Sequence, residues 1–160
     1  MCKIYMVEKY RKEGVIMSEE RIELFFHQIN QKIRNEYNKN LESVKLNAEM
    51  WAIIKDLHER EEKFNQASAT AWIISDRLNI DFKEIEIILD KMVNKDWLVA
   101  VQSPTDRRTV SYFLSNKSQS LLSYLLEQEK YIKNKIFKDF SENEREVFIG
   151  LLKRIEMNFN

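Results

Sequence analysis

Residues 97–114 contain the pattern that most constrains the fold of this 160-residue chain. An apolar run at 97–101 is followed by Ser103, Pro104, Thr105 and Asp106, then by two arginines and an alternating segment at 109–114. Proline and aspartate favour a turn, and alternation of apolar with polar residues is typical of a strand with one buried face. We therefore predict a β-hairpin that carries Arg107 and Arg108 at its tip.

Helical patterns lie on both sides of this hairpin. A buried stripe at spacing i, i+3, i+4, i+7 follows Asp81 and predicts a helix with one face in the core; it consists of Ile85, Ile88, Leu89 and Met92. Thr70 begins a shorter helical pattern before it, and Ser115 begins a long one after the hairpin, because hydroxyl side chains cap free N–H groups. The order helix, turn, helix, strand, basic tip, strand, helix predicts a winged helix-turn-helix, mostly α with a small β-hairpin wing.

The remaining helical patterns lie at 18–40, 47–57 and 141–155, and residues 60–66 are predicted to be a polar loop. The first and last helices carry more apolar surface than a small central domain can cover, and a dozen exposed large side chains would be costly. We therefore predict a two-fold homodimer formed by the terminal helices. The alternative is that these helices fold back on their own chain.

Composition supports a helical protein and excludes several classes. The chain has only two glycines and one proline, fewer than a sheet-rich fold with many tight turns needs. The one cysteine excludes an internal disulfide, and apolar runs of at most five residues exclude a membrane span. A cytoplasmic location is the expectation. A purine-rich codon pattern before Met17 favours Met17 as the true start in a bacterium, with residues 1–16 a translated leader. Residues 1–17 are accordingly expected to be a leader or disordered tail outside the domain.

No pattern indicates catalysis, a metal site or a cofactor. The two histidines, His27 and His58, lie far apart and have no cysteine or histidine neighbour at metal-ligand spacing. Nucleophile–base sets and glycine-rich phosphate loops are absent from the sequence. The arginine-tipped hairpin behind a helix-turn-helix pattern instead indicates binding to double-stranded DNA.

The order of these parts resembles the multiple-antibiotic-resistance regulator (MarR) family, over about residues 18–158. The match rests on the Asp-x-Arg turn at Asp106 and Arg108, on residues 46–57 around Trp51, on residues 74–78, and on Asp81 at the start of the recognition helix. The resemblance implies an obligate homodimer, a pseudo-palindromic operator, and release by a small ligand or an oxidant. It also implies that Asp106 braces Arg108, which enters the minor groove.

The recognition helix departs from the family pattern because it is acidic. Lys83 and Thr70 are predicted to hold phosphates, while Glu86 and Ile87 face the bases. Residues 68–118 contain seven basic and seven acidic side chains, so nonspecific attraction to DNA is weak. Two functions stay open: a regulator that binds promoter DNA selectively, or the same fold acting through protein–protein contacts as an antirepressor or heterodimer partner.

The domain is expected to be single, spanning 18–160, with a DNA-binding part at about 46–115 and a dimerisation part at 18–40 and 116–160. A small-molecule effector would bind between these parts, as the fold class implies. The candidate pocket residues are aromatic, and they could instead be core or dimer contacts: Phe25, Phe26, Trp51, Trp72, Tyr112 and Tyr124.

Overall fold

The structure is a computed structural model and describes residues 21–106 and 108–159. The chain divides into two units, one up to Asn35 and one from Glu36 onward. Of the first unit, the structure describes residues 21–35, which are mostly the N-terminal part of helix α2 (Ile22–Leu41). The predicted Ser18 cap, the Met17 start and Cys2 lie outside the described residues. No helix in the described parts of the chain has the length and apolar character to span a bilayer.

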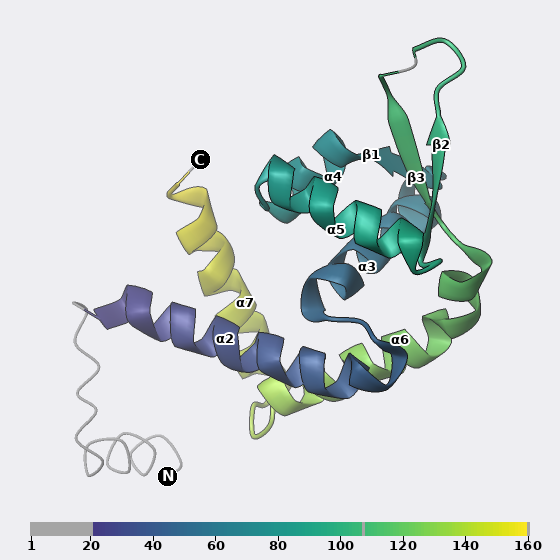
Figure 1. Cartoon of the computed structure of the whole chain (residues 1–160). Coiled ribbons are helices and arrows are strands. Elements are labelled where there is room, and N and C mark those ends of the chain that lie inside the picture. Colours follow the sequence, from purple (N-terminus) through teal and green to yellow (C-terminus); the bar gives the residue numbers. More distant parts are fainter. Residues whose placement is uncertain (1–20, 107, 160) are drawn as a thin grey trace, which may run out of the picture. The chain divides into compact units, whose positions relative to one another are not determined.

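The second unit contains the predicted winged helix-turn-helix (Figure 1). After α2 and a short 3₁₀ turn (Glu42–Val44), it is built from α3 (Ala48–Phe64), β1 (Ser68–Thr70), α4 (Ala71–Leu78), α5 (Phe82–Asn94), β2 (Leu98–Gln102) and β3 (Val110–Leu114). The three strands form one antiparallel sheet in the order β1-β3-β2. The β2–β3 hairpin extends beyond helices α4 and α5 and ends in the predicted wing tip (Figure 1).

Polar side chains cap these helices at the predicted residues. Asn47 accepts a hydrogen bond from the Met50 backbone, Thr70 accepts one from Ile73, and Ser115 accepts one from Ser118. Each cap satisfies an N–H group that has no partner inside its own helix. Asn79 ends α4 in the left-handed region (φ 50°), a conformation that asparagine tolerates better than most residues. The helix-turn-helix is therefore delimited by local sequence signals.

The core of the second unit lies between α3, α4, α5, the sheet and α6. The predicted stripe of α5 is confirmed: Ile85, Leu89 and Met92 are fully buried, and Ile88 packs against them. On β3, Tyr112 and Leu114 are buried on one face and Val110 packs against the same core, as the alternation predicts. One face of α5 thus rests on the core, which leaves the opposite face of this helix to the exterior.

The predicted loop at 60–66 is wrong, because α3 continues to Phe64. Its last turns contain ion pairs one helical turn apart, Lys55–Glu59, His58–Glu62 and Lys63–Glu59, which stabilise a helix of polar residues. Arg60 is buried and donates a hydrogen bond to the Gln66 side chain, 2.6 Å away. The polar composition of this segment therefore reflects a solvated helix end and not a loop.

Helices α6 (Asn116–Ile136) and α7 (Glu142–Met157) follow the wing. Three phenylalanine rings, Phe137, Phe140 and Phe148, meet edge to face at the corner between them, with centroids 5.8–6.2 Å apart. The apolar pattern after Ser115 continues through Phe137 and Phe140 and predicts a longer helix, but α6 ends at Ile136. The pattern Ser141-x-x-Glu144 predicts a capping box, and these two residues form it at the start of α7. The ring contacts thus join the end of α6 to α7.

Helix α7 exposes its apolar stripe. The exposed residues of this stripe are Val147, Phe148, Leu151, Leu152 and Ile155. A methyl group added at Gly150 would meet nothing within 4 Å. Stripes at i, i+4 and i+8 spacing are ordinarily buried against another element.

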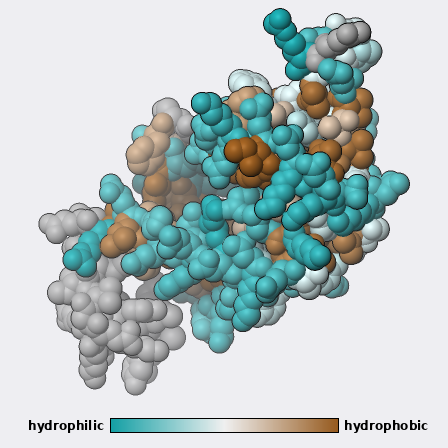
Figure 2. Space-filling model, in the orientation of Figure 1, coloured by the Kyte–Doolittle hydropathy of each residue, from teal (hydrophilic) through white to brown (hydrophobic). Residues whose placement is uncertain are grey.

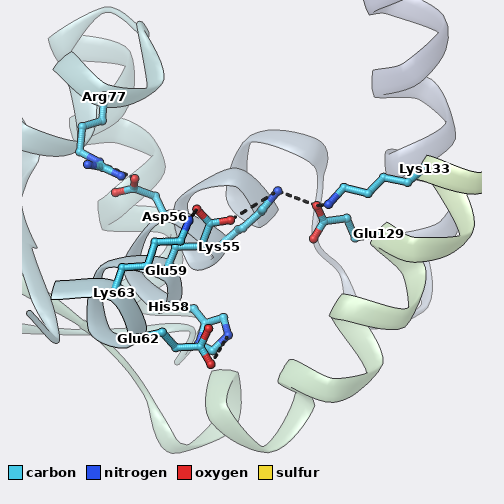
Figure 3. A network of polar contacts seen from close by, with 9 residues as sticks. All are labelled: Lys55, Asp56, His58, Glu59, Glu62, Lys63, Arg77, Glu129 and Lys133. Atoms are coloured by element: carbon cyan, nitrogen blue, oxygen red, sulfur yellow. Dashed lines mark hydrogen bonds and ion pairs between the residues drawn. The ribbon is translucent and has the colours of Figure 1, made fainter. Parts of the chain in front are cut away.

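An ion pair connects helix α3 to helix α4 (Figure 3). Arg77 of α4 donates through Nε to Asp56 Oδ1 of α3 at 2.6 Å. The aspartate side chain is 6% exposed and the arginine 37% exposed, so the pair lies between a surface and a buried salt bridge. The other carboxylate oxygen of Asp56 is buried and has no hydrogen-bond partner among the described residues. The carboxylate therefore depends on Arg77 for its stabilisation.

We expect Arg77→Met to lower the free energy of unfolding by about 1–3 kcal/mol, because it leaves a buried carboxylate without a cation. The matched control is Lys63→Met, which removes a cation from an exposed pair and should cost less than about 1 kcal/mol. Urea unfolding at one fixed protein concentration measures both. Equal costs for the two variants would contradict this account of the α3–α4 contact.

A second buried carboxylate connects α6 to α3. Glu129 is 4% exposed, and its Oε1 atom lies 2.5 Å from Lys55 Nζ and 2.7 Å from Lys133 Nζ (Figure 3). Burial raises the pKa of Glu129, but the hydrogen bonds from Lys133 and Lys55 outweigh it, so that this pKa is lowered from its ordinary value of 4.5. Glu129 thus fixes α6 to the helix that supports the helix-turn-helix.

This lowered pKa predicts a pH dependence of stability. The contribution of ionised Glu129 is complete above 4.5, the value it has when unfolded, and is lost as the pH falls through its lower folded value. Between pH 5 and about pH 3, the free energy of unfolding should therefore fall more steeply for the native chain than for Glu129→Gln. Glu127→Gln, at an exposed position of the same helix, is the control and should retain the native slope. A Glu129→Gln slope identical to the native one would count against the ion pairs.

Candidate nucleic-acid interface

The wing tip is a turn organised by Asp106. Its carboxylate accepts the backbone N–H of Arg108 at 3.0 Å and the Thr109 hydroxyl at 2.8 Å. The Ser103 hydroxyl in turn accepts the Asp106 backbone N–H at 3.3 Å. These bonds, first that from the Arg108 backbone and then that from Thr109, lower the pKa of Asp106. The turn is therefore held in one conformation by an ionised side chain.

The contact between Asp106 and Arg108 that the resemblance implies is made through the backbone. The charge-assisted bond to Asp106 comes from the backbone N–H of Arg108. Aspartate side chains commonly bond backbone N–H groups two residues on, and the short reach of Asp106 favours that partner. The side chain of Arg108 is exposed at the tip. Arg107 lies outside the described residues.

The outward face of α5 carries the predicted base-facing residues. Lys83, Glu86, Ile87 and Asp90 follow one another at i, i+3, i+4 and i+7, and all four are exposed. They repeat, on the opposite side of the helix, the spacing of the buried stripe. Ile87 is 70% exposed, which is unusual for a large aliphatic side chain. The stripe as a whole carries one positive and two negative charges.

The first turn of α5 is capped by Asp81, which accepts the backbone N–H groups of Lys83 and Glu84 at 2.9 and 3.4 Å. The pattern Asp81-x-x-Glu84 predicts a capping box, in which the Glu84 side chain bonds back to the cap, but the described contacts of this helix start include no such bond. Thr70 lies at the junction of β1 and α4, and its hydroxyl oxygen accepts a hydrogen bond from the Ile73 N–H. The starts of both helices are therefore formed and positioned before any ligand binds.

Tyr112 lies beneath the recognition helix on β3. Burial raises its pKa first, and the negative charges of Asp90 and Glu86 raise it further. The charges of Glu86 and Asp90, although both residues are exposed, therefore act on the hydroxyl of Tyr112. Neither carboxylate has an ion-pair partner among residues 21–106 and 108–159.

The candidate pocket residues occupy different environments. Trp51 and Tyr112 belong to the core, and Tyr124 packs against it while its hydroxyl reaches the Asn40 carbonyl and Ser43. Trp72 is 67% exposed on α4. Phe25 and Phe26 belong to the first unit, so a pocket shared by all six stays a prediction. Within the described ranges, no group of three or more His, Cys, Asp or Glu side chains could hold a metal ion.

Comparison with known proteins extends these observations. No family model matches the chain. The chain is 25% identical over 144 residues to the HTH-type transcriptional regulator MhqR of Bacillus subtilis, which covers 89% of this chain and 95% of MhqR. The E. coli MarR protein in complex with operator DNA, a mutant form, superposes with a TM-score of 0.74 at 20% identity, over 87% of this chain and 97% of that chain.

A second solved structure has the same fold. Bordetella bronchiseptica BpsR, whose DNA binding is regulated by 6-hydroxynicotinic acid, superposes with a TM-score of 0.73 at 17% identity, over 86% of this chain and 94% of that chain. At these identities the superpositions establish the winged-helix fold, and the alignment with MhqR adds a relationship in sequence over nearly the whole chain. The chain is thus similar in fold to the E. coli MarR protein and to BpsR, and similar in sequence to the regulator MhqR.

Proposed function

We propose that this chain is a dimeric transcriptional regulator that binds pseudo-palindromic promoter DNA. The observation that carries the proposal is that one unit holds both DNA-reading elements, an exposed helix face on α5 and an arginine-tipped hairpin. In winged-helix proteins the helix enters the major groove, and the wing reaches the neighbouring minor groove or the phosphates. The operator-bound MarR structure, which shares this fold, supports the same use here.

Arg108 is the proposed minor-groove contact of the wing, with Arg107 beside it in the sequence. A planar cation suits a narrow groove because the negative potential is strongest there. Asp106 contributes indirectly, since it fixes the backbone from which Arg108 projects. Because the carboxylate is bound to backbone N–H and hydroxyl groups, it leaves the guanidinium group available to DNA.

The helix-turn-helix supplies the other proposed contacts. Thr70 at the start of α4 and Lys83 at the start of α5 are placed to approach phosphates, where helix N-termini and lysine ammonium groups are favourable partners. Glu86 and Ile87 follow on the outward face and are proposed to meet base edges. The phosphate contacts would fix the position of the protein on the duplex, and Glu86 and Ile87 would determine which base sequence is bound.

A homodimer is proposed because α7 presents an apolar stripe that stays exposed among the described residues. An identical surface on a second copy is the simplest complement, since two-fold interfaces are self-complementary. Two copies also suit a pseudo-palindrome, in which each half-site receives one recognition helix and one wing. Within α2, a second apolar stripe could also take part in the dimer interface; its exposed residues are Ile22, Phe26 and Ile29.

A small-molecule effector is proposed as the regulator of DNA binding, by analogy with BpsR. In the second unit, the aromatic residues Trp51, Trp72, Tyr112 and Tyr124 are the candidate lining. Of these, Trp72 is the most exposed. A cytoplasmic location follows from the same proposal, because promoter DNA is there.

Salt dependence of binding tests the proposal against the protein–protein alternative, which the acidic face of α5 would also allow. Fluorescence anisotropy of a labelled duplex from the gene's own promoter region would be measured between 50 and 200 mM salt. About three to five phosphate contacts per chain predict a slope of log K against log salt of roughly −5 to −9 for the dimer. Absence of binding at the lowest salt would overturn the proposal and favour a protein partner.

A further inference from the structure

The outward face of α5 has a chemistry that most DNA-reading helices lack. Of its four residues, Lys83 is a donor, Glu86 and Asp90 are acceptors only, and Ile87 offers methyl groups. Figure 2 shows apolar side chains exposed within the hydrophilic surface over α4 and α5, and on α5 the exposed apolar residues are Phe82 and Ile87. A face of this kind repels phosphates more than it attracts them.

The carboxylate of Glu86 is available to contact a base edge. The described residues hold no ion pair with its carboxylate, and the helix cap is supplied by Asp81. It lies in the second turn of the recognition helix, among the N-terminal residues that contact base edges in helix-turn-helix complexes. An unpaired carboxylate placed in the major groove is unfavourable unless it receives a hydrogen bond there.

The hydrogen-bonding groups on each base edge limit which base the carboxylate of Glu86 can contact. In the major groove, cytosine presents its N4 amino group as a donor, whereas guanine presents two acceptors that repel a carboxylate. Adenine offers a donor beside the N7 acceptor, so a carboxylate meets attraction and repulsion together. Thymine offers an acceptor and a methyl group. Cytosine is the one base whose edge matches Glu86 without a competing acceptor.

We propose that Glu86 determines operator specificity by accepting a hydrogen bond from a cytosine N4 amino group in each half-site. Ile87, the next residue, contacts the methyl group of an adjacent thymine. Asp90 adds negative charge that weakens binding to every sequence, so that only a site with the matching base contacts is bound. This inference rests on the proposed DNA-binding function and adds to it the base that the acidic helix selects.

A selection from a random duplex library tests the assignment, with the full-length native chain, Glu86→Gln and Asp90→Asn compared at one salt concentration. The native chain should enrich a two-fold motif with a cytosine column in each half. Glutamine pairs with adenine N6 and N7, so Glu86→Gln should change that column from cytosine to adenine and leave the others. The native chain should prefer cytosine there by about tenfold. Asp90→Asn removes the same charge and should strengthen binding to all sequences while the cytosine column stays.

The outcomes separate the two proposals. A native motif in which no column changes in Glu86→Gln would overturn the assignment of Glu86 while the DNA-binding function stands. A change of the same column in Asp90→Asn would also overturn it, because general charge repulsion would then explain the preference. No enrichment of any sequence by the native chain would overturn both proposals.

Discussion

Leu151→Asp is expected to convert the dimer into a monomer and to abolish operator binding. Leu151 lies at the middle of the exposed stripe of α7, which we propose is the dimer interface. An unpaired carboxylate in an apolar interface costs about 2–3 kcal/mol, and the two-fold axis places it there twice. The total of roughly 4–6 kcal/mol corresponds to a dimer Kd about a thousandfold to ten-thousandfold higher. Sedimentation equilibrium measures this Kd.

The control is Lys153→Asp, which introduces the same side chain on the opposite side of α7, where the charged residue is exposed. It should leave the dimer Kd within a few-fold of the native value, as surface substitutions usually do. Far-ultraviolet circular dichroism reports whether Leu151→Asp keeps its helices. An unchanged dimer in Leu151→Asp would show that α7 does not form the interface.

Arg108→Ala is expected to weaken operator binding by about 30- to 1,000-fold. Each wing should lose about 1–2 kcal/mol of minor-groove contact, and a dimer carries two wings. The dimer Kd and the free energy of unfolding should not change, because Arg108 is exposed at the tip and Asp106 binds only its backbone. Fluorescence anisotropy at fixed salt gives the affinity.

Lys138→Ala is the matched control, since it removes an exposed cation at the α6–α7 corner, far along the chain from the wing. It should reduce affinity less than about threefold through the net charge alone. If both variants lost affinity equally, the wing would contribute charge but no specific contact, and the assignment of Arg108 would be wrong.

Local signals predicted the fold of the second unit well. The helix caps depend only on neighbouring residues, and the stripe of α5 depends only on helical spacing. Both can therefore be recognised in one sequence; the caps are Asn47, Thr70 and Ser115. The end of α3 was missed because its polar residues 60–64 resemble a loop in composition, while the ion pairs that keep them helical involve side chains one turn apart. The helical conformation of residues 60–64 therefore follows from those ion pairs and not from the spacing of apolar residues.

Long-range contacts could not be predicted from the sequence. Lys55 and Glu129 are separated by 74 positions, and no local pattern indicates that this glutamate is buried. The same holds for Asp56 and Arg77, which are 21 positions apart. These pairs hold the elements that carry the candidate site, so the sequence identified its exposed residues but not what positions them. The hydrogen bond from the Arg108 backbone N–H to Asp106 depends on the geometry of the turn, so the sequence did not predict it either.

Footprinting of the full-length chain on its own promoter region tests the central claim most directly. A winged-helix dimer predicts two protected half-sites related by two-fold symmetry, with centres about one helical turn or a multiple of it apart. Protection should disappear in Arg108→Ala at the same protein concentration and persist in Lys138→Ala. A native dimer that protects no DNA at low salt, or an Arg108→Ala footprint identical to the native one, would contradict the account.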